Sequence, residues 1–115
     1  MKIMIVDDNA AMRETIEHVL SGLGVEFDQC DDGSQAVSRY DEVMPDVVLM
    51  DIRMTGMDGL IATAEIKRSH PDASIIIVTN YDDREFRAEA SRLGASGFVL
   101  KKDLTELRHI IGTSH

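Results

Sequence analysis

The chain alternates short apolar runs with longer segments in which apolar residues recur at helical spacing. Four of the runs are rich in aliphatic residues and lack the alternation of a half-exposed strand: residues 3–6, 47–50, 75–78 and 98–100. Continuous runs of this kind are typical of buried parallel strands. Residues 25–27 alternate between apolar and charged side chains, as expected for a strand at the edge of a sheet. The pattern therefore predicts five strand-helix units.

The segments between the strands carry an apolar stripe with a period of 3.6 residues, which predicts amphipathic helices. Asn9 can cap the first helix, and the third is expected after Asp58-Gly59. Three pairs with the spacing acid-x-x-Glu/Gln, which satisfies free amides at a helix start, predict the other beginnings: Asp32 with Gln35, Asp82 with Glu85, and Asp103 with Glu106. Turns are expected at Gly24, Gly33 and Gly94, and a frayed tail or linker at residues 112–115.

Parallel strands joined by helices carry those helices on both faces of the sheet, and right-handed crossovers leave few topologies for five units. The best fit is a flavodoxin-like α/β fold, a three-layer (βα)5 sandwich with strand order 2-1-3-4-5. The chain has 115 residues, of which 43% are hydrophobic, which suits one ordinary domain with one core. We therefore expect residues 1–115 to form a single domain.

Polar side chains that can handle a phosphoryl group follow four of the predicted strands. Asp7 and Asp8 follow the first strand, Asp51 the third, Thr79 the fourth and Lys101 the fifth. Since functional groups gather at the carboxyl ends of parallel strands, these five are expected to form one site. Three converging carboxylates need a cation or a shared proton, and Mg²⁺ prefers such oxygen ligands. The full set disfavours the plainer alternative that the acids only cap helices.

Composition narrows the choice of partners and location. The net charge of −9, from 21 acidic and 12 basic residues, disfavours direct binding to nucleic acid or to an anionic membrane. A single cysteine and the lack of a signal peptide or an 18-residue apolar run make a reducing cytoplasm the expected location. Cys30 is expected to be a small buried hydrophobe whose thiol pKa is raised by neighbouring aspartates. The four histidines lack metal-ligand spacing and are expected at the surface.

Five motifs follow one another over essentially the whole chain: Ile5-Val6-Asp7-Asp8-Asn9, Leu49-Met50-Asp51-Ile52-Arg53-Met54, Gly56-Met57-Asp58-Gly59, Val78-Thr79 and Gly94-Ala95-Ser96-Gly97-Phe98-Val99-Leu100-Lys101. Together they resemble the receiver domain of two-component response regulators, of which the chemotaxis response regulator is one. The resemblance implies a domain that receives a phosphoryl group from a phosphohistidine on a sensor histidine kinase or a phosphotransfer protein.

The resemblance also implies roles for the residues at the strand ends. Asp51 is the expected phosphate acceptor. The family's Mg²⁺ ligands correspond to the side chains of Asp8 and Asp51, the backbone carbonyl of Arg53 and, through a water, Asp7. Lys101 is expected to hold a phosphoryl oxygen. Phosphoryl transfer needs charge neutralisation and alignment more than covalent help, which agrees with these roles.

A conformational switch is implied by two further residues. In the family, the hydroxyl that corresponds to Thr79 moves to a phosphoryl oxygen, and an aromatic residue that corresponds to Phe98 fills the vacated space. The surface that changes is expected to consist of the fourth helix, the fifth strand and the fifth helix. A homodimer that forms on phosphorylation is compatible with this switch.

The sequence departs from the family at the two ends of the site. Lys101 is followed by Lys102-Asp103 rather than by the common Pro, so no cis bond is expected there. The order Leu-Lys-x-Asp resembles receivers joined to LuxR-type DNA-binding domains, which points to transcriptional control. Thr55 replaces a common Pro, so a less constrained loop is expected. Arg53 and Tyr81 lie two residues beyond Asp51 and Thr79, and we predict that they set the lifetime of the phosphorylated state.

Three functions compete for this sequence. The first is a phosphorylation-driven switch, enzyme-like only in assisting its own phosphorylation and dephosphorylation and therefore not classed as an enzyme. The second is a pseudo-receiver that binds proteins without phosphorylation, which the intact acids, Thr79 and Lys101 disfavour. The third is a flavodoxin-type FMN protein, which ranks last because the acidic first loop repels a flavin phosphate.

Overall fold

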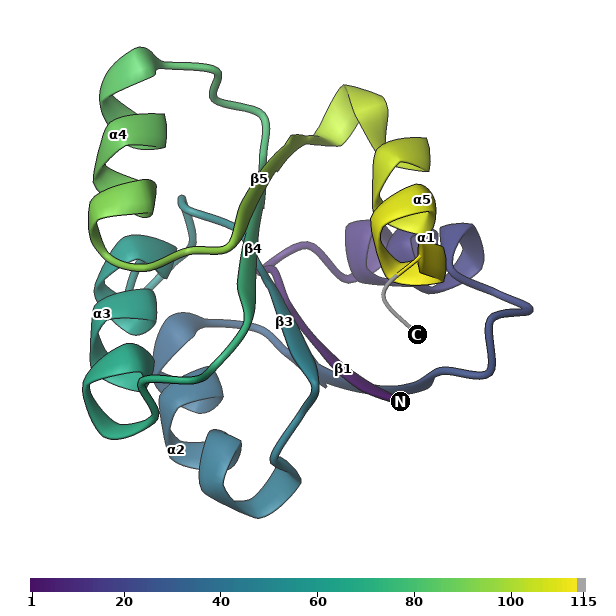
Figure 1. The fold of residues 1–115 in the computed structure, drawn as a ribbon, viewed down its shortest axis with the longest axis horizontal. Helices are drawn as coiled ribbons and strands as arrows, with labels where there is room; N and C mark the ends of the chain where they lie inside the picture. The colour runs from purple at the N-terminus through teal and green to yellow at the C-terminus, as the bar shows by residue number, and fades with distance from the viewer. Residues whose placement is uncertain (114–115) are drawn as a thin grey trace.

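Strands and helices alternate along the chain, and the strands form one parallel sheet between two layers of helices (Figure 1). The computed structural model describes residues 1–113. Its strands are β1 (Lys2–Val6), β2 (Glu26–Cys30), β3 (Val47–Met50), β4 (Ile75–Thr79) and β5 (Gly97–Leu100). Its helices are α1 (Ala10–Val19), α2 (Gly33–Val43), α3 (Gly59–Ser69), α4 (Arg84–Arg92) and α5 (Thr105–Thr113), and a 3-10 turn, η1 (Lys101–Asp103), precedes α5.

The sheet has the strand order β2-β1-β3-β4-β5, which confirms the predicted flavodoxin-like (βα)5 topology. All the strand pairs are parallel, so every strand presents its carboxyl end at the same edge. The register places Val6, the last residue of β1, between Cys30 of β2 and Met50 of β3. The residues that follow β1 and β3 are therefore neighbours at the centre of this edge.

Two hydrophobic cores hold the helices to the sheet. In Figure 1, α2, α3 and α4 cover one face, and α1 and α5 cover the other. Met4 points into the first core and Ile5 into the second, because successive side chains of a strand alternate between faces. Burial of each such side chain contributes about 1.5–3 kcal/mol. The central strands need continuous apolar runs because helices cover both faces of the sheet. No helix in the described part of the chain is long and apolar enough to span a membrane.

The first two predicted helix caps are confirmed. Asn9 is the N-cap of α1, and its side-chain oxygen accepts a hydrogen bond from the Met12 amide at 3.0 Å. Asp32 is the N-cap of α2 and accepts one from the Gln35 amide at 2.9 Å. In both cases the cap satisfies an amide that the first turn of the helix leaves free.

The two later caps were predicted wrongly. Helix α4 starts at Arg84 after Asp83, because the side chain of Asp82 forms an ion pair with Arg87 at 2.7 Å instead of capping the helix. Asp103 belongs to η1, so α5 starts only at Thr105. The spacing of an acid and a glutamate does not by itself decide which free amide, or which side chain, the acid will contact.

The predicted turns and tail are confirmed in part. Gly24 and Gly94 lie at turns with φ of 72° and 97°. Gly33 is instead the first residue of α2, where an added Cβ would lie 2.7 Å from the Met57 carbonyl oxygen. In the predicted tail, Gly112 and Thr113 belong to α5, and residues 114–115 lie outside the described residues.

Cys30 ends β2 and is buried, as predicted for a small hydrophobe. Burial is the main cause that raises the pKa of its thiol to about 11, while the Arg39 guanidinium acts in the opposite direction. Asp28 and Asp31 raise the pKa further by smaller amounts, so the predicted effect of neighbouring aspartates is real but secondary. The thiol is protonated at neutral pH, which makes it a poor nucleophile.

A close approach at Gly59 gives a testable consequence for stability. A Cβ built on Gly59 would lie 1.8 Å from the carbonyl oxygen of Asp51, a backbone atom that cannot move without distorting the site. We expect Gly59→Ala to lower the free energy of unfolding, measured by urea denaturation, by more than about 3 kcal/mol. The matched control is Gly112→Ala in α5, where an added Cβ would meet no atom of the described residues within 4 Å apart from its own helix backbone and chain neighbours. It should be neutral or stabilise by up to about 1 kcal/mol, and equal effects of the two variants would contradict the prediction.

Candidate functional site

Three carboxylates meet at the carboxyl edge of the sheet. Asp7 and Asp8 follow β1, and Asp51 follows the adjacent β3, with its amide bonded to the Val6 carbonyl at 3.0 Å. One oxygen from each carboxylate lies within 4.8 Å of the others. Asp7 and Asp51 are 2% and 5% exposed, whereas Asp8 is exposed to solvent. The three acids, called the acidic pocket below, are thus buried at the base and open at the rim.

Lys101 brings a positive charge to the acidic pocket from β5. Its Nζ lies 2.8 Å from Asp7 Oδ2 and 3.0 Å from Asp51 Oδ2, and only 10% of its side chain is exposed. Burial acts to lower the pKa of Lys101, but the hydrogen bonds to Asp7 and Asp51 outweigh it and raise the pKa overall. The ammonium therefore stays charged and pairs with both carboxylates at once.

The charge of the acidic pocket is not balanced by this ammonium. Three carboxylates and one ammonium leave a formal charge of −2. Burial raises the pKa of Asp51 and the Asp7 charge adds to the rise, although the hydrogen bond from Lys101 opposes it. A divalent cation with oxygen ligands, such as Mg²⁺, would neutralise the excess. The groups available to hold it are the carboxylates of Asp7, Asp8 and Asp51 and the Arg53 carbonyl, to which no described residue donates a hydrogen bond.

Arg13 is a neighbour of the site that the sequence did not predict. Its Nη1 donates to the backbone carbonyl of Asp7 at 2.5 Å, and its Nε donates to Gln29 Oε1 at 2.7 Å. Arg13 thereby ties α1 and β2 to the turn that carries Asp7. No sequence signal could have shown this, because an arginine on an amphipathic helix faces solvent by default.

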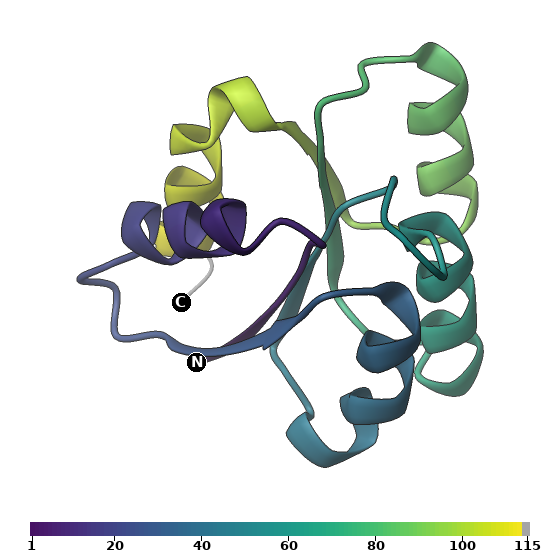
Figure 2. The same cartoon turned by 180° about the vertical axis from the view of Figure 1, so that it is seen from behind.

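Thr55 contacts the acidic pocket from the loop between β3 and α3. Its amide donates to Asp8 Oδ2 at 3.1 Å, and its hydroxyl lies 3.4 Å from the same oxygen. Figure 2 shows this loop beside the turn that follows β1. The amide and hydroxyl of Thr55 therefore hold the loop against the turn that follows β1, and the expectation that replacing Pro by Thr leaves the loop less constrained stays a prediction.

Thr79, the last residue of β4, lies beside the acidic pocket. The register pairs Met50 with Ile77, so Thr79 lies one residue further along its strand than Asp51 does. Thr79 is fully buried, and its Oγ1 accepts a hydrogen bond from the Tyr81 amide at 3.3 Å. Among the described residues no acceptor takes a hydrogen bond from this hydroxyl, so its proton can be donated to a further acceptor.

Phe98 connects β5 to helix α4. It pairs with Ile77, so Phe98 and Thr79 lie on the same face of the sheet, on adjacent strands. The guanidinium carbon of Arg87, from α4, lies 4.5 Å from the centre of the Phe98 ring. The ring is thus held between the core and a cation on its outer side.

Arg53 and Tyr81, both proposed from their sequence positions, are in contact. The Arg53 guanidinium carbon lies 4.6 Å from the centre of the Tyr81 ring and 5.8 Å from that of Phe86 in α4. The two rings make an edge-to-face contact with their centres 6.1 Å apart. The three side chains, called the aromatic cover below, form one cluster, with Arg53 two residues beyond Asp51.

His70 differs from the surface histidine that the sequence predicted. It is the C-cap of α3, and 27% of its side chain is exposed. Its Nε2 contacts Asp41 Oδ1 at 2.6 Å, and its ring centre lies 4.6 Å from that of Tyr40 in α2. The histidine packs α3 against α2 and lies apart from the acidic pocket.

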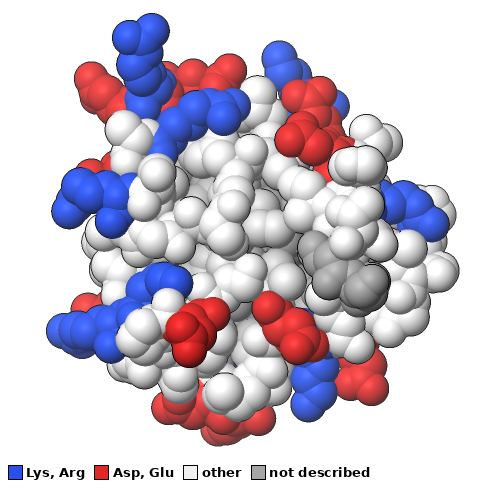
Figure 3. All heavy atoms as spheres, in the orientation of Figure 1, with Lys and Arg blue, Asp and Glu red and all other residues white. Residues whose placement is uncertain are grey.

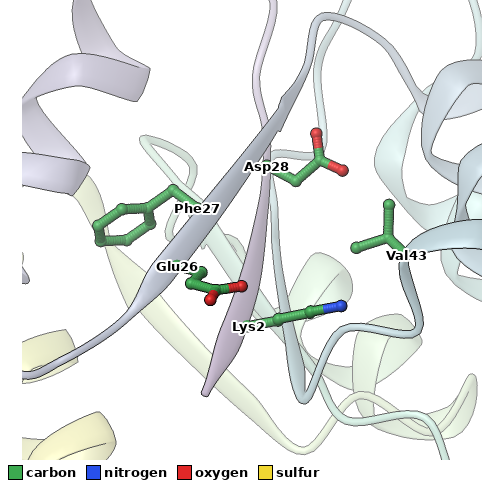
Figure 4. A pocket seen from close by; sticks show the side chains of 5 residues that line it. All are labelled: Lys2, Glu26, Phe27, Asp28 and Val43. Carbon is green, nitrogen blue, oxygen red and sulfur yellow. The ribbon is translucent and has the colours of Figure 1, made fainter.

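A second hollow lies at the opposite edge of the sheet. It has a volume of about 170 Å³ and is lined by Lys2, Glu26, Phe27, Asp28 and Val43 (Figure 4). Lys2 and Glu26 start β1 and β2, so the hollow is remote from the carboxyl ends where the acidic pocket lies. In Figure 4, Phe27 points away from Val43. The hollow is lined by both acidic and basic side chains, and this mixture does not indicate a particular class of ligand.

Charged side chains surround the face of the molecule that Figure 3 shows. Acidic and basic groups are interspersed around its rim, and its centre is uncharged. This face therefore offers no continuous basic surface to a polyanion such as nucleic acid.

Comparison with known families agrees with the motif order and the fold. The family described as the response regulator receiver domain matches residues 3–112. This chain belongs to the response regulator receiver family. The acidic pocket, Thr79 and Lys101 of this receiver fall within the matched segment.

Three relatives illustrate the similarity. The oxygen regulatory protein NreC of Staphylococcus carnosus (strain TM300) is 41% identical over 105 residues, which cover 88% of this chain and 48% of NreC. A LuxR-family two-component response regulator from Aurantimonas sp. SI85-9A1 has a structure with a TM-score of 0.91 and 33% identity, covering 97% of this chain and 82% of that one. The response regulator TrrA of Thermotoga maritima, solved in complex with Mg(2+)-BeF, has a TM-score of 0.87 and 31% identity, covering 97% and 96%. This receiver thus spans about half the length of curated relatives such as NreC.

The shared ion pair of Lys101 gives a test of the electrostatics of the pocket. Lys101→Met leaves Asp7 and Asp51 buried without their cation, so urea denaturation should show a loss of about 3 kcal/mol without Mg²⁺. Adding Mg²⁺ should stabilise this variant more than the wild type, because the ion replaces the missing charge. Lys102→Met, at the exposed next residue, is the control and should change stability by less than about 0.5 kcal/mol. An equal response of Lys101→Met and wild type to Mg²⁺ would contradict the argument.

Proposed function

We propose that this receiver accepts a phosphoryl group on Asp51 from a phosphohistidine of a sensor histidine kinase or a phosphotransfer protein. The observation that carries the proposal is the ammonium of Lys101, shared between Asp7 and Asp51 in a pocket with excess negative charge. Such a pocket attracts the cation and the positive groups that phosphoryl transfer requires. The complex of TrrA with Mg(2+)-BeF, at 31% identity, supports the same chemistry for this chain.

The transfer step needs few groups of the protein. A carboxylate oxygen of Asp51 bonds to phosphorus as the bond from phosphorus to the donor imidazole nitrogen breaks, and the imidazole leaves with its bonding electrons and takes up a proton. Lys101 holds one phosphoryl oxygen, and the Thr79 hydroxyl donates to another. Mg²⁺ in the acidic pocket supplies charge neutralisation when bound. The receiver changes only itself, so we propose a phosphoacceptor switch rather than an enzyme.

The switch starts at Thr79. A phosphoryl group on Asp51 adds negative charge and three acceptor oxygens, which favour donation by the Thr79 hydroxyl over its contact with the Tyr81 amide. Phe98, on the same face, then turns into the space that Thr79 leaves. Because Phe98 lies under Arg87, this movement changes the surface formed by α4, β5 and α5.

The output of the switch is proposed to be transcriptional and cytoplasmic. Support comes from the LuxR-family regulator from Aurantimonas, which is 33% identical, and from the Leu100-Lys101-Lys102-Asp103 segment, whose order resembles that of receivers joined to LuxR-type domains. With a net charge of −9, the receiver is unsuited to bind DNA itself, so contact with DNA belongs to a separate domain of the full-length protein. A homodimer that forms on phosphorylation through the α4-β5-α5 surface would link the switch in the receiver to DNA binding by that domain.

Intact mass spectrometry after incubation with acetyl phosphate tests the acceptor. The wild type should gain the mass of one phosphoryl group only when Mg²⁺ is present, and Asp51→Asn should gain none. Asp72→Asn, an exposed aspartate before β4, is the matched control and should react as the wild type does. No gain by a folded wild type would favour the alternative of a pseudo-receiver that binds proteins without phosphorylation.

The aromatic cover gives a prediction about the lifetime of the acyl phosphate. Arg53→Ala or Tyr81→Ala opens the side of Asp51 to water, so the phosphorylated protein should lose its phosphoryl group faster. We expect roughly a two- to fivefold change, the rate equivalent of an exposed cation–π contact worth about 0.5–1 kcal/mol. Tyr81→Phe keeps the ring and should resemble the wild type. Unchanged dephosphorylation in both alanine variants, followed by intact mass over time, would contradict this role.

A further inference from the structure

Asp8 is the one carboxylate of the acidic pocket that burial and Lys101 do not hold in place. Asp7 and Asp51 are both buried and both contact Lys101, whereas Asp8 is exposed. An exposed aspartate samples several side-chain conformations, and a ligand that selects one of them must overcome the loss of this freedom. Whatever holds Asp8 beforehand therefore affects how tightly a cation binds.

In this chain the group that holds Asp8 is Thr55. The Thr55 amide donates to Asp8 Oδ2 at 3.1 Å, and the Thr55 hydroxyl lies 3.4 Å from the same oxygen. Within the described residues no donor contacts Asp8 Oδ1, so one oxygen is engaged by the loop and the other stays available. The amide contact has the better geometry, and the hydroxyl contact is long.

The backbone of the loop makes this contact specific to the residue at position 55. Gly56, directly after Thr55, has φ of 88°, a left-handed conformation that favours glycine and turns the chain sharply at this point. A proline in place of Thr55 would have neither an amide hydrogen nor a hydroxyl, so it could make neither contact. The threonine thus supplies two donors at a position where the proline that is common in the family supplies none.

We propose that Thr55 is a positioning residue for cation binding, which holds the Asp8 carboxylate in the conformation that binds a divalent cation. The inference rests on the proposed function in one respect, that the acidic pocket binds Mg²⁺. Because the contact joins Asp8 to the loop between β3 and α3, cation binding and the order of this loop are coupled in both directions.

The test is isothermal titration calorimetry of Mg²⁺ into the full chain and four variants at position 55. Thr55→Pro removes both donors and should weaken Mg²⁺ binding roughly three- to tenfold, less than the 10- to 100-fold typical of well-formed outer-shell partners. Thr55→Val and Thr55→Ala keep the amide and should weaken binding by at most about twofold, because the hydroxyl contact is long. Thr55→Ser restores both donors and should match the wild type.

Two further measurements separate positioning from a general effect on the loop. Because the Thr55 contact with Asp8 is exposed, its loss in Thr55→Pro should lower the stability measured by urea denaturation without Mg²⁺ only slightly. A merely structural role would instead lower that stability and leave the Mg²⁺ dissociation constant unchanged. In an Asp8→Ala background, the rise in unfolding temperature produced by high Mg²⁺ should be the same with and without Thr55→Pro. A further loss in that background would show that the effect does not pass through Asp8, and would overturn the proposal.

Failure of the inference can be told apart from failure of the proposed function. A wild type that does not bind Mg²⁺ overturns both. A wild type that binds Mg²⁺, together with a Thr55→Pro variant that binds it equally or more tightly, overturns only the role of Thr55.

Discussion

The ion pair that Lys101 shares between Asp7 and Asp51 is the interaction on which the site depends. Lys101 follows β5, so its long side chain reaches past the end of β4 to carboxylates that follow β3 and β1. Removing one partner of a buried pair leaves an uncompensated charge, which costs about 3–5 kcal/mol. The ends of three strands are therefore held together by one ammonium, and the acids cannot spread apart to relieve their repulsion.

The same ion pair leaves the pocket with unbalanced negative charge, which is the basis for the proposed binding of a divalent cation. One ammonium does not neutralise three carboxylates, so the excess negative charge favours a divalent cation, which would in turn offset the charge of the phosphoryl group proposed for Asp51. The close approach of Gly59 to the Asp51 backbone and the hydrogen bond of Thr55 to Asp8 keep the loop after β3 against the pocket. Stability and binding thus draw on the same few contacts.

Two routes lead from the pocket to helix α4. One passes through Arg53, two residues beyond Asp51, which stacks on Tyr81 and on Phe86 of α4. The other passes from Thr79 to Phe98, whose ring lies under Arg87 of α4. Both routes end on consecutive residues of one helix, Phe86 and Arg87, so the proposed change in charge at Asp51 would act on α4 through two neighbouring contacts. This convergence explains how a local chemical change could reach a surface that a partner contacts.

The sequence by itself indicated the parallel sheet, its strand order and the meeting of Asp7, Asp8, Asp51 and Lys101, with Thr79 at the same edge. The reason is that continuous apolar runs are typical of a covered parallel sheet, whose carboxyl ends share an edge. The sequence did not determine which group an acid contacts. Asp82 forms an ion pair with Arg87 instead of capping α4, and Asp8 accepts a hydrogen bond from the Thr55 amide. The contact of Arg13 with the Asp7 carbonyl was equally hidden. A periodic pattern of burial involves many residues, so it predicts an element correctly even when one position is misread. A single hydrogen bond depends on the loop conformations that bring two distant residues within about 3 Å, and only the tertiary structure decides those conformations.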